Sequence, residues 1–147
     1  RGLGNSVQPK NVRQELVDVR HWVGASPADR TAHLLLGEPG LFMGPTTGAA
    51  ELVAHWVATT LPDAKVAVIM PDEGHRHAET VYNDEWLSAL PGWPCKEPSE
   101  PRTLTTIAPA AETQWTRFLW LRRSLDDVLK TREASDVPPA VGAAENL

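Results

Sequence analysis

The sequence predicts an α/β fold built on a parallel sheet. Strand-like and helix-like segments alternate along the first 90 residues, and the clearest strand, residues 66–70, is apolar on both faces. A strand of this kind is typical of the centre of a sheet that helices cover on both sides. A hydrophobic fraction of 41% with a net charge of −5 is typical of a folded globular chain.

The N-terminal segments predict one strand and one helix. Residues 1–12 have the glycines, asparagine and proline of a loop, and residues 17–23 carry the interrupted apolar pattern of a short strand. Ser26 and Pro27 are typical of a helix start, with Ser26 as the N-cap, and Gly37 is typical of a helix end.

The alternation then repeats. We expect a very short buried strand at residues 41–43, a helix at 49–60 and the central strand at 66–70, followed by another helical segment. The loops at residues 44–48 and 71–74 each follow a strand and precede a helix. Because ligands bind at the carboxyl ends of parallel strands, we expect both loops at one ligand-binding edge of the sheet.

The last third has a different character. Four prolines interrupt residues 91–101, and an apolar stripe along residues 112–130 predicts an amphipathic helix. We therefore expect an α/β part at residues 1–90, a Pro-rich and helical extension at 91–134 and a disordered tail at 135–147.

The composition disfavours several classes of protein. No basic run suggests a nucleic-acid binder, no apolar stretch is long enough for a membrane span, and one cysteine forms no internal disulfide or zinc site. We expect a cytoplasmic protein with no metal, nucleic-acid or membrane partner. The chain begins at Arg1 rather than Met, so an upstream start and an N-terminal signal stay open.

Two loops hold the residues with the most promising chemistry. Residues 44–48 place a pair of threonines between two glycines. Such a segment can direct hydroxyl and backbone N–H groups at a ligand. From this motif alone, however, the favoured interpretation is a helix N-cap at Thr46 or Thr47. Residues 71–77 hold two acids, two histidines and an arginine. The alternative for that cluster is a solvated loop with local ion pairs, and the two histidines lack further ligands for a metal.

Three segments match one enzyme family in order and in spacing. Residues 1–9 read Arg-Gly-Leu-Gly-Asn-Ser-Val-Gln-Pro, residues 40–50 read Gly-Leu-Phe-Met-Gly-Pro-Thr-Thr-Gly-Ala-Ala, and residues 66–76 run from an apolar strand into Pro-Asp-Glu-Gly-His-Arg, with Asp-Glu-Trp-Leu at 84–87. They resemble the glycine loop, the Gly-x-Ser-Ser-Gly-Ala-Ala segment and the Pro-Asp-Ser-Gly-Glu-Arg segment of the cysteine synthase branch of fold-type II pyridoxal-phosphate (PLP) enzymes. Each motif alone is modest, but three in sequence are specific.

The resemblance implies the C-terminal portion of a fold-type II enzyme, with a parallel sheet in a three-layer large domain, PLP as cofactor and a homodimeric full-length protein. Thr46 matches the hydroxyl that meets the pyridine nitrogen, where a neutral partner suits β-elimination and β-replacement. The implied cofactor-binding residues are Thr46, Gly2, Gly4, Pro71 and Asp72, and the implied substrate-side residues are Asn5 and Thr47.

The family's Schiff-base lysine has no match in this chain. None of Lys10, Lys65, Lys96 and Lys130 lies in the family's lysine motif, and no Gly-rich phosphate loop precedes a helix. We therefore expect no catalytic residue in this chain, which by itself would be inactive. An isolated half of a parallel sheet is also expected to aggregate.

The implied activity of the full-length protein is a transferase or lyase reaction of amino-acid biosynthesis. The expected reaction is β-replacement on an activated serine, O-acetylserine or O-phosphoserine, with sulfide to give cysteine. The alternatives are a cystathionine or diaminopropionate synthase, a Ser/Thr dehydratase, or a stand-alone non-catalytic half-domain that acts as a partner subunit. A plain α/β domain with an unrelated phosphate ligand is the remaining interpretation.

Overall fold

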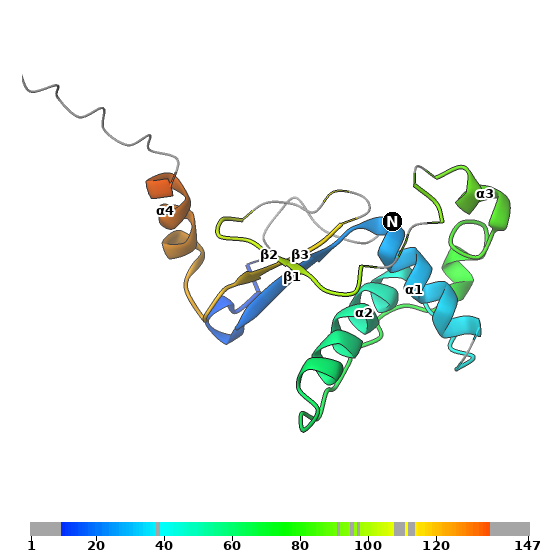
Figure 1. Ribbon diagram of the computed structural model, residues 1–147, viewed down its shortest axis with the longest axis horizontal. Coiled ribbons are helices and arrows are strands. Elements are labelled where there is room, and N and C mark those ends of the chain that lie inside the picture. The colour runs from blue at the N-terminus through cyan, green and yellow to red at the C-terminus, as the bar shows by residue number, and fades with distance from the viewer. Residues whose placement is uncertain are drawn as a thin grey trace, which may run out of the picture.

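The computed structural model is a mixed α/β arrangement of short strands and helices (Figure 1). It describes residues 10–37, 39–90, 92–94, 96, 98–107, 111 and 114–135. In chain order the elements are η1 (Gln14–Leu16), β1 (Val19–Val23), α1 (Ala25–Gly37), α2 (Pro45–Thr60), η2 (Gly74–His77), α3 (Asp84–Ser88), β2 (Arg102–Thr103), β3 (Trp115–Leu119) and α4 (Leu125–Ser135).

The described sheet has three strands in the order β1-β3-β2. β1 pairs antiparallel with β3, from Val19 opposite Leu119 to Val23 opposite Trp115, whereas β2 pairs parallel with β3. The α/β class agrees with the prediction. The parallel pairing that we expected throughout the sheet is present only between β2 and β3.

Residues 66–70 are extended but belong to no strand, so the predicted central strand is wrong for the described chain. Ile69 is 84% exposed and Val66 is 39% exposed. The physical reason is that no second strand among the described residues lies alongside to pair with this segment. The short strand expected at residues 41–43 is reduced to a single bridge between Met43 and Glu73.

The helix expected at residues 112–130 is also wrong over its first half, where β3 forms instead. Trp115, Thr116 and Phe118 are β-branched or aromatic, and they are buried in the sheet. Leu121 and Arg122 take positive φ angles of 55° and 58°, and the chain turns there. The helix begins only at Leu125, where the Ser124 hydroxyl accepts from the Asp127 backbone N–H at 3.1 Å.

The predicted helices at residues 26–37 and 49–60 are confirmed as α1 and α2, but their predicted caps are wrong. α1 begins at Ala25, so Ser26 lies inside the helix, and its buried hydroxyl finds no hydrogen-bond partner in the described residues. α2 begins at Pro45 after Gly44, which takes the N-cap position, so Thr46 and Thr47 lie in the first turn. The division at residue 90 stays a prediction. Of the tail expected at residues 135–147, Ser135 is the last residue of α4, and residues 136–147 lie outside the described residues.

α1 and α2 cross in close contact, and Gly48 makes that contact possible. A Cβ built on Gly48 would lie 2.0 Å from the Ala28 carbonyl oxygen and 2.8 Å from the Ala32 nitrogen. Ala28 and Ala32 are fully buried. Small residues on both helices therefore allow the two backbones to approach, and this places the start of α2 beside α1.

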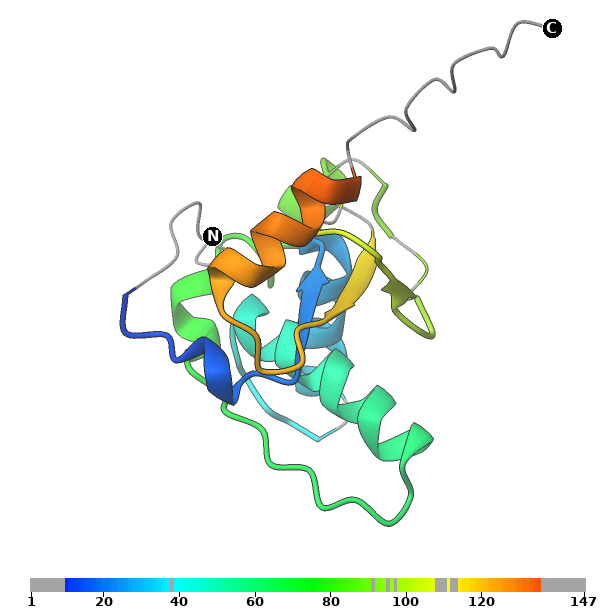
Figure 2. The ribbon, with the colours of Figure 1, turned by 90° about the vertical axis from the view of Figure 1, so that its left-hand side faces the viewer.

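The sheet lies between α2 and α4 (Figure 2). On one face, the Trp56 ring of α2 packs against His21 at 5.9 Å and against Trp115 at 5.8 Å between ring centroids. On the other face, Phe118 and Trp120 form a core with Val128 of α4. Each face of this small sheet thus buries its aromatic side chains against one helix.

His21 is held neutral by its surroundings. Its Nδ1 accepts a hydrogen bond from the Trp115 indole N–H at 3.0 Å. Burial, assisted by the nearby Arg117 guanidinium, lowers the pKa of His21 to about 4. A protonated imidazole would lose this hydrogen bond because Nδ1 would become a donor.

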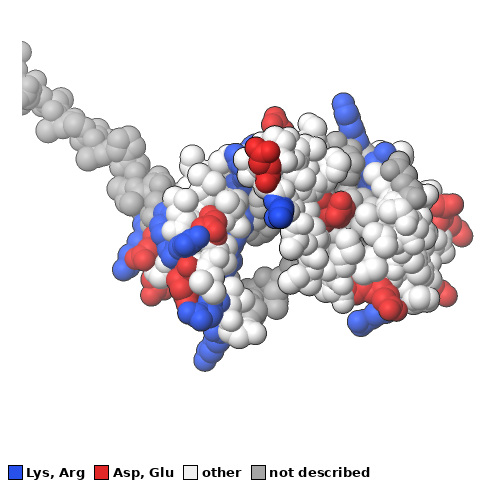
Figure 3. Space-filling view, turned by 90° about the horizontal axis from the view of Figure 1, so that it is seen from below, with Lys and Arg blue, Asp and Glu red and all other residues white. Residues whose placement is uncertain are grey.

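The charged side chains on the face shown in Figure 3 lie in scattered groups of both signs. Arg122 and Asp18 form one exposed ion pair at 2.7 Å, and Arg13 and Glu15 form another at 2.8 Å. Such pairs contribute little to stability. Among the described helices, none has the length and apolar character needed to cross a membrane.

Gly48→Ala is expected to destabilise the protein by about 1–3 kcal/mol, because the new methyl group would overlap the Ala28 carbonyl. Gly37→Ala is the matched control at the end of α1, where an added Cβ meets nothing within 4 Å. Urea unfolding of both variants measures the difference. Equal stabilities would contradict the close helix contact.

Stability is expected to fall as the pH drops from about 6.5 towards 4, since the unfolded chain takes up a proton at His21 while the folded chain does not. The loss attributable to His21 is up to about 2–3 kcal/mol. His21→Gln should flatten the stability profile over this range, with His55→Gln as the control at an exposed position of α2. An unchanged profile in His21→Gln would argue against a neutral, buried imidazole.

Candidate functional site

Backbone hydrogen bonds join the two loops that the sequence singled out. The Gly44 N–H donates to the Asp72 carbonyl at 3.0 Å, and the Gly74 N–H donates to the Phe42 carbonyl at 2.9 Å. Between these bonds lies the bridge of Met43 and Glu73. The two loops lie side by side, but the sheet edge at which both were expected is not formed by the described residues, because unpaired segments rather than strands lead into the loops.

Two glycines keep the joined loops in close contact. A Cβ on Gly44 would lie 2.1 Å from Asp72 Oδ2, and a Cβ on Gly74 would lie 2.4 Å from the Phe42 ring. A side chain at Gly44 would displace the Asp72 carboxylate, and one at Gly74 would displace the Phe42 ring. The start of α2 is therefore held against the Asp72 carboxylate by the absence of a side chain at Gly44.

Tyr82 fixes the outer side of this junction. Its hydroxyl contacts the carbonyl oxygen of Met43 and lies 3.2 Å from that of Ala32, and its ring packs on Phe42 with 4.6 Å between centroids. Burial raises the pKa of the Tyr82 phenol, so it remains a hydrogen-bond donor at neutral pH. The tyrosine thus links α1, the residues before α2 and the polar loop.

Asp72 and His77 form a carboxylate–imidazole pair beside the start of α2. His77 Nε2 lies 2.8 Å from Asp72 Oδ2, and the two side chains are 16% and 19% exposed. Asp72 Oδ1 is buried and has no hydrogen-bond partner among the described residues. A cavity of about 450 Å³ opens next to the pair, lined by Pro45, Asp72, Arg76, His77, Thr80, Val81 and Trp86.

The structure brings together part of the predicted site. Asp72 lines the cavity, while Pro71 before it is exposed. Thr46 is half-buried in the first turn of α2, next to Pro45 of the cavity wall. Thr47 is fully buried, and within the part of the chain that the structure describes its hydroxyl has no hydrogen-bond partner. Gly2, Gly4 and Asn5 lie outside the described residues.

Sequence reasoning placed His77 in a polar cluster but did not pair it with Asp72. Their separation of five residues spans the start of η2, and the turn of that helix brings the imidazole back onto the carboxylate. Tyr82 and Trp86 were noted only as part of a motif. Their contacts with the loops could not be read from spacing, because they depend on how residues 78–86 fold back over α1.

The cavity can hold a polar ligand, because several of the side chains that line it can form hydrogen bonds. The carboxylate and imidazole can hold or pass a proton, and Arg76 adds a positive charge at the cavity wall. No group of three or more His, Cys, Asp or Glu side chains in the described part of the chain could hold a metal ion. Lys10, Lys65, Lys96 and Lys130 are all exposed, and none lines this cavity.

The curated proteins that are similar to this chain include two that are named N-(2-amino-2-carboxyethyl)-L-glutamate synthase. The protein of Cupriavidus metallidurans is 31% identical over 94 residues, and that of Ralstonia nicotianae is 31% identical over 91 residues. Each alignment covers 60% of this chain. No family profile matches the chain, and no solved structure matches it.

The aligned part spans 27% of the length of each relative. The chain therefore resembles these synthases over only that part of their length. The similarity supports an enzyme family of the synthase type.

Proposed function

We propose that the protein carrying this chain is a PLP-dependent enzyme that performs β-replacement on an activated serine. The observation that carries the proposal is the junction of the two loops, because the resemblance assigns both loops to the cofactor ring and the hydrogen bond between Gly44 and Asp72 joins them. The similarity to two named synthases over 60% of the chain supports the same class of activity.

The residues present fit one edge of the cofactor. Thr46 lies in the first turn of α2 and does not occupy its N-cap position, so its hydroxyl would serve as a neutral partner for the pyridine nitrogen. The unpartnered Asp72 Oδ1 is a second group that can accept a hydrogen bond. Attachment of the aldehyde and binding of the phosphate would require a lysine motif and a Gly-rich phosphate loop that the sequence of this chain does not show.

When bound, PLP withdraws electrons from the substrate Cα and so eases removal of the Cα proton and of the leaving group on Cβ. Thr46 would orient the ring and leave its nitrogen uncharged. Asp72 and His77 would hold the ring edge and keep the start of α2 in place. In the overall reaction the Cβ–O bond breaks, the oxygen leaves with its electron pair, the nucleophile forms a bond to Cβ, and the Cα proton is returned.

The incoming nucleophile has two candidates. The motif resemblance favours sulfide, which gives cysteine. The name of the two relatives favours the amino group of L-glutamate, since a 2-amino-2-carboxyethyl group on that nitrogen is the carbon skeleton of serine joined through Cβ. Both reactions use the same activated serine, so the same site serves either.

Mass spectrometry of the products tests the proposed activity. The protein that carries this chain, supplied with PLP and O-acetyl-L-serine or O-phospho-L-serine, is expected to form cysteine with sulfide or N-(2-amino-2-carboxyethyl)-L-glutamate with L-glutamate. Pyruvate and ammonia without any acceptor would instead indicate a dehydratase. No product under any of these conditions would refute an enzyme of this class.

Thr46→Ser is expected to preserve the absorption spectrum and affinity of bound PLP, because it keeps the hydroxyl. Thr46→Val removes the hydroxyl but keeps the branched shape, and it should shift the absorption maximum and weaken PLP binding about tenfold. Both variants should melt like the parent, since Thr46 does not cap α2. Identical PLP spectra for the two variants, with a loss of melting temperature only in Thr46→Val, would show that Thr46 has a purely structural role.

A further inference from the structure

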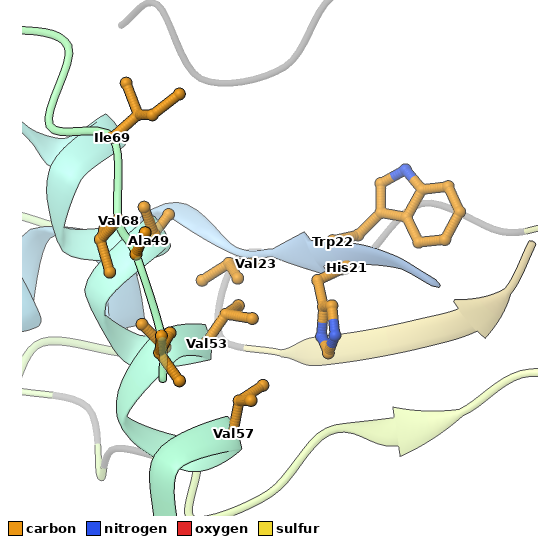
Figure 4. A pocket seen from close by; sticks show the side chains of 12 residues that line it. His21, Trp22, Val23, Ala49, Val53, Val57, Val68 and Ile69 are labelled. Carbon is orange, nitrogen blue, oxygen red and sulfur yellow. The ribbon is translucent and has the colours of Figure 1, made fainter. Parts of the chain in front are cut away.

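Two cavities of the described chain differ in their chemistry. The larger one, of about 580 Å³ between β1 and residues 66–69, is mostly apolar, with Val53 and Val57 of α2 projecting into it (Figure 4). The smaller one, of about 450 Å³ beside the Asp72–His77 pair, has charged groups of both signs in its wall. Its volume lies within the range of about 300–1,000 Å³ that is typical of small-molecule sites. The smaller cavity is therefore the better suited of the two to orient a charged ligand.

Arg76 gives the smaller cavity a positive charge. It lies in η2 directly before His77, and it forms no ion pair with another described residue. A guanidinium carries a planar set of N–H donors that matches the two oxygens of a carboxylate. Arg76 can therefore bind the carboxylate of a ligand in this cavity.

His77 and Thr80 add hydrogen-bond acceptors to the wall of the same cavity. Nε2 of His77 lies 2.8 Å from Asp72 Oδ2, so a neutral ring carries its proton on Nε2 and keeps Nδ1 as an acceptor. The Thr80 hydroxyl donates to the His77 carbonyl at 3.2 Å, and its oxygen can still accept a hydrogen bond. The Asp72 carboxylate behind the imidazole adds a negative charge. Together these groups suit the ammonium group of a ligand.

The rest of the cavity wall is apolar or aromatic. It consists of Pro45 at the start of α2, Val81, and Trp86 of α3. Such a surface suits an aliphatic or aromatic side chain. A ligand with only a negative charge would be repelled by Asp72, and one with only a positive charge would be repelled by Arg76. A zwitterion with an apolar side chain complements all parts of the wall.

We propose that this cavity binds a free α-amino acid with an apolar side chain. Its carboxylate would pair with Arg76, its ammonium group would donate to His77 Nδ1 and Thr80, and its side chain would pack on Trp86. Because Pro45 is the first residue of α2, the bound amino acid would also rest against the helix turn that contains Thr46. The inference goes beyond the proposed function and does not depend on it, since binding requires neither PLP nor an activated serine.

Isothermal titration calorimetry on the longest natural protein that carries this chain tests the proposal, with L-leucine as the probe. 4-Methylpentanoate lacks the amino group and 3-methylbutylamine lacks the carboxylate, so each should bind at least about tenfold more weakly than L-leucine. Equal affinities for the three compounds would overturn the proposal, because only the apolar part would then be recognised. The absence of saturable binding of L-leucine, L-valine and L-phenylalanine at millimolar concentration would also overturn it.

A matched pair of variants locates the bound amino acid. Arg76→Gln removes the partner of the carboxylate and should weaken L-leucine binding at least about tenfold, while the affinity for 3-methylbutylamine should not fall. Arg102→Gln makes the same change at an exposed position of β2 outside the cavity, and it should leave both affinities unchanged. Equal L-leucine affinities in the two variants would overturn the proposal.

The absorption spectrum of PLP separates this inference from the proposed function. L-Leucine in the cavity is expected to bind with the same dependence on Arg76 whether or not the protein contains PLP. Binding that occurs only with PLP present, changes its spectrum and is insensitive to Arg76→Gln would place the amino acid at the cofactor and overturn the inference. A protein that forms no β-replacement product yet binds L-leucine through Arg76 would refute the proposed function alone.

Discussion

The backbone hydrogen bond from Gly44 to Asp72 is the contact that positions the candidate site. It fixes the first turn of α2 against the polar loop, and it requires that Gly44 carry no side chain, since a Cβ would overlap the Asp72 carboxylate. The same packing sets the Asp72–His77 pair beside Pro45 and opens the cavity next to it. A shift of either loop would therefore change the positions of the Asp72 carboxylate, the His77 imidazole and the first turn of α2 together.

The rest of the described chain supports this contact from both sides. Gly48 lets α2 lie close against α1, and Tyr82 spans from the loop region to the Ala32 carbonyl of α1. Further along α2, Trp56 anchors the helix on the aromatic face of the sheet. α2 is thus held at its start by backbone contacts and along its length by small and aromatic residues, so the position of Thr46 is set by the fold rather than by its own side chain.

The sequence predicted best those features that local chemistry decides. The apolar face of residues 49–60 predicted most of α2. The alternation of strands and helices predicted the loops at 44–48 and 71–74 at one edge of a sheet, and the structure has them side by side without that sheet. The sequence-based prediction failed where strand pairing determines the structure. Residues 66–70 have the composition of a central strand but have no partner strand among the described residues. Trp115–Leu119 forms a strand because β1 lies alongside it. The carboxylate–imidazole pair was also missed, since the turn of η2 determines that contact. Gly2, Gly4 and Asn5 stay predictions.

A double-mutant cycle between Gly44 and Asp72 tests most directly whether the two loops meet as described. Gly44→Ala alone is expected to lower the free energy of unfolding by about 1–3 kcal/mol, because its Cβ meets the Asp72 carboxylate. In an Asp72→Ala background the carboxylate is gone and the backbone hydrogen bond remains, so the same change at Gly44 should cost much less. A coupling free energy of about 1 kcal/mol or more supports the junction of the loops. Additive effects would show that Gly44 and Asp72 do not touch and would remove the structural basis for a shared site.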